Sequence, residues 1–233
     1  MTEAEWLACE DPDLMLGGLR ERGLASERKQ RLFAVACCRR VWHLLTDERS
    51  RAAVRMAERH ADGRAGLKEL ARTRVDAVTA ADRVARNAGW AAYHAAVQRV
   101  SDESIDSAYL AAVESQARSA RRAARAAGGN EAAAWEKARV AEMRAQADLL
   151  RELFGPLPFR DVPVAPSWLR WNEGTVVKLA RALYDGRRFG ELGILADALE
   201  EAGCAEPELL AHCRAGGAHV VGCWALDLLL GQD

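Results

Sequence analysis

The stretch from residue 67 to residue 154 constrains the fold most, because alanine and leucine recur there at helical spacing. The pattern predicts three long helices, at about 67–99, about 102–127, and from a cap at Asn130 to Phe154. Short connections make consecutive helices antiparallel neighbours, and alanine at their contacts lets the helix axes approach to about 8 Å. The sequence therefore predicts an all-α protein built on a bundle of long, Ala-rich antiparallel helices.

The composition supports the same fold class. Half of the 233 residues are apolar, and β-branched and aromatic residues are few, which favours helix over sheet. A chain of this length can bury a full core, as one domain or as two small ones. Residues 32–38 are all apolar, so we expect a central helix of the N-terminal half there.

A proline-rich stretch predicts the division of the chain. Four of the six prolines fall in residues 155–166, where they break helix and favour extended backbone. We therefore expect a helical body at 1–154, a linker at 155–166 and a C-terminal module at 167–233. The module is predicted to hold four short helices, at about 173–185, 189–202, 206–214 and 219–230.

Charge and cysteine content set the expected environment. The net charge of −1 creates no overall field that would attract nucleic acid or a membrane. No apolar signal region follows a basic N-terminus, and no run approaches the roughly 18 apolar residues of a membrane span, so we expect a cytoplasmic protein without membrane contact. Cys37 and Cys38 cannot pair with each other without strain, and we interpret the cysteines as reduced thiols.

Soft metal ligands cluster near the C-terminus. Zinc binds cysteine thiolate and histidine imidazole in tetrahedral sets of four. If His219 opens a helix, Cys223 lies one turn further on the same face, whereas the adjacent His212 and Cys213 point about 100° apart. A structural zinc is therefore one hypothesis, although the segment has no CxxC pair. Its candidate ligands are Cys204, His212, Cys213, His219 and Cys223.

The same residues also fit two other interpretations. Free cysteine is among the most buried residue types, so Cys213 and Cys223 are also explained as small core residues without a metal. A cysteine–histidine nucleophile pair is the weakest interpretation, because the sequence identifies no third group to orient the histidine.

A basic stripe follows helical spacing in the second long helix. Arg118, Arg121, Arg122 and Arg125 occupy positions i, i+3, i+4 and i+7, and such a stripe can contact the phosphates of a nucleic acid or another acidic partner. The alternative is a solvated helix face, with pairing to Glu114.

Trp168 and Trp171 flank the predicted linker, where they either form a protein-docking surface or seal the hinge.

Two segments resemble a known family. The start (MTEAEWLACEDPDLMLGGLRE, then SERKQRLFAVACCRRVWHLLTDERSRAAV) and the run from Trp168 to Leu230 are similar to the two ends of a large planctomycete protein family. The resemblance covers roughly half of the chain and implies no known activity, cofactor or catalytic residue. Family members tend to carry an arginine before the glycine of the GCW motif, where this chain has Val221.

These observations lead to three functional hypotheses. The chain contains no GxSxG, GxxxxGK[ST], GxGxxG after a strand, or HExxH motif, so we favour a non-enzymatic interaction or adaptor protein with a protein partner. The first alternative is a nucleic-acid-associated protein that uses the arginine stripe. The second alternative is a zinc-stabilised C-terminal module.

Overall fold

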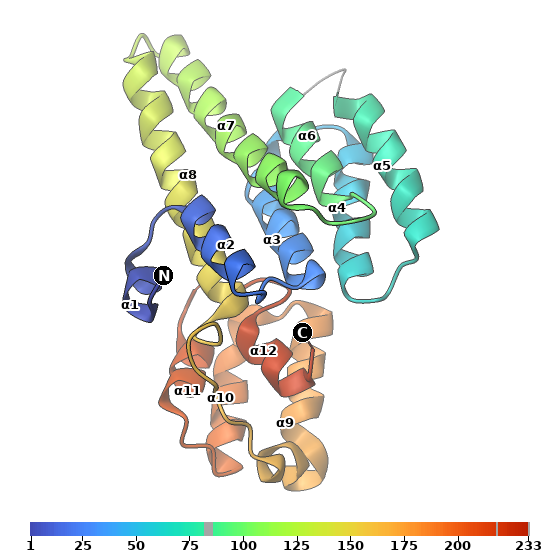
Figure 1. The fold of residues 1–233 in the computed structure, drawn as a ribbon, viewed down its shortest axis with the longest axis vertical. Coiled ribbons are helices and arrows are strands. Elements are labelled where there is room, and N and C mark those ends of the chain that lie inside the picture. The colour runs from blue at the N-terminus through green and yellow to red at the C-terminus, as the bar shows by residue number, and fades with distance from the viewer. Residues whose placement is uncertain (82–85, 218, 233) are drawn as a thin grey trace. The chain divides into compact units, whose positions relative to one another are not determined.

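The computed structural model describes residues 1–81, 86–217 and 219–232, and within these ranges it is helical with no β-strand. The predicted all-α class is therefore confirmed (Figure 1). None of the described helices combines the length and the apolar character needed to cross a bilayer. The helices are α1 (Glu3–Ala8), α2 (Pro12–Glu21), α3 (Glu27–Arg40), α4 (Glu48–Ala61), α5 (Leu67–Ala81), α6 (Arg86–Ala95), α7 (Asp102–Ala126), α8 (Glu131–Phe154), α9 (Pro166–Gly186), α10 (Leu192–Glu201), α11 (Pro207–Arg214) and α12 (Trp224–Leu230), with short 3-10 turns at Trp42–Leu44 and Phe189–Glu191.

The chain forms two compact units, Glu3–Leu150 and Arg151–Asp233. Helix α3 lies at the centre of the first unit and packs against α4, α6 and α7. The apolar run predicted to form a central helix is buried along its whole length, from Leu32 to Cys38. A helix that is apolar nearly all round is stable only in such a position, because each of its faces meets another helix.

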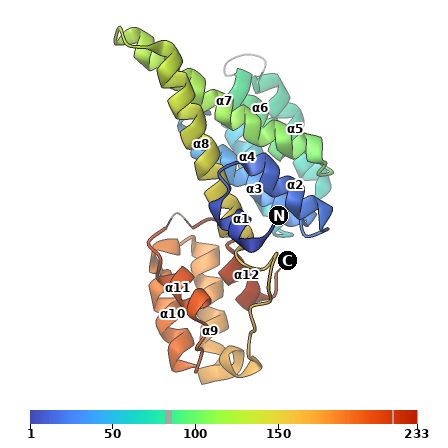
Figure 2. The same cartoon turned by 60° about the vertical axis from the view of Figure 1, so that its left-hand side comes forward.

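The single long helix predicted at 67–99 is wrong. The structure has two helices there, α5 and α6, which pack against each other and against α4 (Figures 1 and 2). Part of the predicted helix, residues 82–85, lies outside the described residues. An unbroken helix of this span would be about 50 Å long, so its two halves could not both lie against α4. Packing as two helices lets both segments bury alanines against the same neighbour.

The next two predicted helices are confirmed. Helix α7 begins at a reciprocal cap, in which the Ser104 backbone N–H donates to Ser101 Oγ at 3.2 Å and the Ser101 N–H donates to Ser104 Oγ at 3.0 Å. At the start of α8, Asn130 Oδ1 accepts a hydrogen bond from the Ala133 N–H at 3.0 Å. Both helix starts are thus fixed by side chains close in sequence.

The second unit contains the last turn of α8, a helix-free segment at 155–165, and helices α9 to α12. Helix α10 packs against α9 and α11, and α12 packs against α9. Near its start α9 is interrupted, and Asn172, Glu173 and Gly174 have left-handed backbone angles. The last helix begins at Trp224 and not at residue 219 as predicted. Gly222 has a φ of 91°, which an α-helix does not accommodate, so the helix starts only after it.

Gly155 lets the chain leave α8 in close contact with α12. Its φ is +54°, and its N–H donates to the Arg151 carbonyl at 2.8 Å. A Cβ at this position would lie 2.6 Å from the indole of Trp224, well inside contact distance. The position therefore needs glycine both for its backbone angle and for the space that the indole takes.

We predict that Gly155→Ala lowers the free energy of unfolding by about 2–5 kcal/mol, from left-handed strain and from overpacking against Trp224. Gly203→Ala is the matched control in the same unit, because Gly203 also has a positive φ, of 87°, but open space around its Cβ position. Gly203→Ala should lower the free energy of unfolding only by the left-handed backbone strain, about 1–2 kcal/mol. Urea denaturation followed by tryptophan fluorescence measures both; equal losses would contradict the contact with Trp224.

Candidate metal centre

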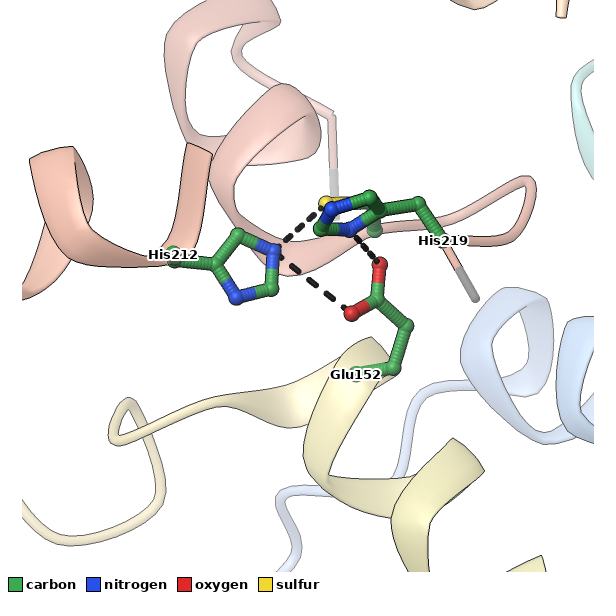
Figure 3. Close-up of side chains that lie close together, drawn as sticks. Glu152, His212 and His219 are labelled. Atoms are coloured by element: carbon green, nitrogen blue, oxygen red, sulfur yellow. Dashed lines mark hydrogen bonds and ion pairs between the residues drawn. The ribbon is translucent and has the colours of Figure 1, made fainter. Parts of the chain in front are cut away.

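Four potential metal ligands converge in the second unit. They are Glu152 in the last turn of α8, His212 in α11, and His219 and Cys223 in the segment before α12. One ligand atom from each residue lies within 4.8 Å of all the others. Figure 3 shows the Glu152 carboxylate pointing towards the two imidazole rings. Three separate parts of the chain thus bring together the donor types that zinc prefers.

The side chains of the group are close enough to surround one metal ion. Glu152 Oε1 lies 3.0 Å from His219 Nδ1, and Glu152 Oε2 lies 3.6 Å from His212 Nε2. Cys223 Sγ lies 3.1 Å from His212 Nε2. With Zn–N of about 2.0–2.1 Å and Zn–S of about 2.3 Å, neighbouring ligands of a tetrahedral zinc are about 3.3–3.7 Å apart. The three separations differ from this range by a few tenths of an ångström, and the remaining pairs of ligand atoms lie within 4.8 Å of each other.

Burial and charge also favour a cation at this position. The side chains of His219 and Glu152 are 4% and 12% exposed, and Cys223 is fully buried. Glu152 lies at the C-terminal end of α8, where the helix dipole disfavours a negative charge. A divalent ion would neutralise the carboxylate and a Cys223 thiolate together, which removes the cost of burying two negative groups.

Two contacts around the group orient the histidines. His219 Nε2 donates to the Ala215 carbonyl at 3.0 Å, which leaves Nδ1 facing Glu152. The indole N–H of Trp224 donates to His212 Nδ1 at 3.1 Å, which leaves Nε2 facing the group. Metal-binding histidines are commonly held by a hydrogen bond at the second ring nitrogen, and the contact of His219 with a carbonyl is of that kind.

The pKa shifts within the group have clear physical causes. The hydrogen bond to Glu152 raises the pKa of His219, whereas burial lowers the pKa of His212. Burial, with Glu152 nearby, raises the pKa of the Cys223 thiol well above its usual value. A nucleophilic cysteine needs the opposite shift, towards thiolate, so these directions speak against a cysteine–histidine nucleophile here.

The structure brings together three of the five ligands predicted from sequence. His212, His219 and Cys223 belong to the group, but Cys204 and Cys213 do not. Both of these cysteines are buried, and burial raises the pKa of Cys213 to about 12, as expected for core thiols. Neighbouring residues on a helix point in different directions, so His212 and Cys213 cannot both face the group.

Sequence reasoning missed one member of the group, Glu152, and predicted the wrong local geometry for His219 and Cys223. Glu152 belongs to α8, far from the cysteine–histidine segment along the chain. The predicted arrangement of His219 and Cys223 one helical turn apart is wrong, because Cys223 precedes the first residue of α12. These two ligands meet through an irregular segment instead. The sequence held one indication of a role for Glu152. Its carboxylate is near the C-terminal end of a predicted helix, where the helix dipole destabilises a negative charge.

The other predicted site residues lie elsewhere. The arginine stripe is in the exposed C-terminal half of α7, where Arg118 pairs with Glu114 and Arg125 lies 3.6 Å from Glu131. Arg121 and Arg122 are exposed, and neither forms an ion pair with a described residue. In the second unit, Trp168 is buried in the first turns of α9 and Trp171 is half-buried.

Comparisons of the chain with protein-family models, with curated proteins and with solved structures find no match.

We predict that iodoacetamide alkylates Cys9 much faster than Cys223 in the native, EDTA-treated protein. Cys9 is partly exposed, whereas Cys223 is buried and its raised pKa keeps it protonated. Peptide mapping by mass spectrometry measures the two rates, and the same reaction in urea is the control that both thiols can react. Alkylation of Cys223 as fast as that of Cys9 would restore the nucleophile hypothesis.

Proposed function

We propose that the second unit is a zinc-binding helical module, with its metal at Glu152, His212, His219 and Cys223. The observation that carries the proposal is the convergence of one carboxylate, two imidazoles and one thiol within 4.8 Å. Mixed nitrogen, sulfur and oxygen donors in tetrahedral arrangement suit zinc, whereas magnesium and calcium prefer oxygen donors alone.

Zinc at this position would cross-link the second unit. Its ligands come from the end of α8, from α11 and from the segment that leads into α12. Helix α11 is short and the segment before α12 is irregular, so hydrogen bonds within helices do not link these three parts of the chain to one another. The free energy of metal binding adds directly to the free energy of folding when the unfolded chain binds the metal weakly.

A protein partner remains our proposal for what the module serves. A metal-stabilised helical unit offers a rigid surface, and the expected adaptor role needs one. The nucleic-acid alternative depends most on Arg121 and Arg122, the two arginines of the exposed stripe that form no ion pair with a described residue.

We predict that the purified full-length protein retains about one equivalent of zinc, and that EDTA lowers its melting temperature. His219→Ala and Glu152→Ala should remove most of the bound zinc, because each deletes a ligand atom from the group. Metal analysis by mass spectrometry and differential scanning calorimetry provide the two measurements.

Cys213→Ala is the matched control for this experiment. It removes a buried thiol from the same helix as His212, but one that lies outside the ligand group. The variant should keep its zinc while losing some stability from the small cavity. Equal loss of zinc from Cys213→Ala and His219→Ala would contradict the assigned ligand set, and a metal-free wild-type protein that cannot be loaded would contradict zinc binding.

For the nucleic-acid alternative, we predict that Arg121→Glu with Arg122→Glu abolishes any shift of a DNA or RNA probe in an electrophoretic assay. Binding through phosphates should also weaken steeply as salt rises. Arg118→Glu with Arg125→Glu, which alters the two arginines already paired with acids, is the comparison and should have the smaller effect. A wild-type protein that shifts no probe at low salt would remove this alternative.

A further inference from the structure

The hydrogen bond from Trp224 fixes which nitrogen of His212 carries a proton. An indole N–H can only donate, so His212 Nδ1, at 3.1 Å, must accept. A neutral imidazole then carries its proton on Nε2. That nitrogen faces Cys223 Sγ at 3.1 Å and Glu152 Oε2 at 3.6 Å, both of which can accept a hydrogen bond. In this tautomer His212 directs an N–H, and not a lone pair, towards Cys223 and Glu152.

A protonated ring nitrogen has no lone pair for a metal. To bind zinc through Nε2, a neutral His212 would have to carry its proton on Nδ1, where it would meet the indole N–H of Trp224 head-on. The indole has little room to retreat, because Trp224 is only 3% exposed and lies against Gly155. His219 has no such conflict, since its Nε2 donates to a carbonyl and its Nδ1 can offer a lone pair.

We therefore propose that zinc at this centre has three protein ligands, Glu152, His219 and Cys223, and that its fourth position holds an exchangeable water molecule or small anion. The N–H of His212 donates a hydrogen bond to this fourth ligand and positions it. The inference rests on the proposed zinc binding and refines its coordination.

Exposure and charge agree with an exchangeable ligand. His212 and Glu152 are the more exposed members of the group, with 16% and 12% of their side chains accessible, whereas His219 and Cys223 are at most 4% exposed. His212 therefore lies on the more exposed side of the group. Carboxylate and thiolate neutralise the ion, so the fourth ligand can be neutral water or a single small anion. Three protein ligands and one open position are the arrangement of catalytic zinc sites.

Zinc affinities of full-length variants test the ligand set. Competition with a chromophoric chelator should show that Glu152→Ala, His219→Ala and Cys223→Ser each weaken zinc binding by more than about tenfold, whereas His212→Ala changes it by less than about threefold. Trp224→Phe should tighten binding severalfold, because His212 can then present a lone pair to the metal. An equal loss of affinity in His212→Ala and His219→Ala would overturn the three-ligand centre.

The fourth position is tested with cobalt in place of zinc and azide as the probe. Added azide should shift the visible absorption bands of the cobalt-loaded wild-type protein, and the shift should be lost in Trp224→Phe, where His212 fills the position. Because Trp224→Phe alters a buried contact, His212→Gln is the second variant. It keeps an N–H donor but offers no imidazole ligand, and it should retain both cobalt and the azide response.

Two outcomes separate this inference from the proposed function. Metal-loaded wild-type protein whose spectrum does not respond to azide would overturn the open position but leave zinc binding standing. Wild-type protein that binds neither zinc nor cobalt would overturn both.

Discussion

The candidate metal centre depends on the carboxylate of Glu152, which lies at the negative end of the α8 dipole, close to two imidazoles and a thiol. Such a group needs positive charge beside it. The hydrogen bond to Glu152 raises the pKa of His219, which favours the positively charged imidazole beside the carboxylate. In the account proposed here, zinc replaces the proton of this imidazole. Three residues further on, Gly155 admits the indole that orients His212.

The parts of the fold that sequence reasoning predicted are those with local causes. Helices α7 and α8 begin where Ser101 and Asn130 cap them, and both caps can be identified from a few neighbouring residues. The separation of α5 from α6 had no such signal, because alanine spacing continues on both sides. Only the packing of both helices against α4 decides it. The late start of α12 depends on the backbone angle of Gly222, which spacing of apolar residues does not reveal.

In the candidate site, too, some residues could be predicted from the sequence and others only from the fold. His212, His219 and Cys223 were predicted because they are close in sequence and chemically matched to zinc. Glu152 was not, because it is one of many glutamates on helices and joins the group only through the fold of the second unit. Cys204 and Cys213 looked equivalent to Cys223 in the sequence, but the structure shows them buried outside the group. Proximity in the chain identified donor types, and tertiary structure selected among them.

X-ray absorption spectroscopy of the zinc-loaded full-length protein tests the central claim most directly, because it counts the atoms bound to the metal and measures their distances. The account predicts one sulfur at about 2.3 Å, with the remaining ligands nitrogen or oxygen at about 2.0–2.1 Å, and loss of the sulfur contribution in Cys223→Ser. A shell without sulfur, or one with two or more sulfurs, would contradict a centre built on Glu152, His219 and Cys223.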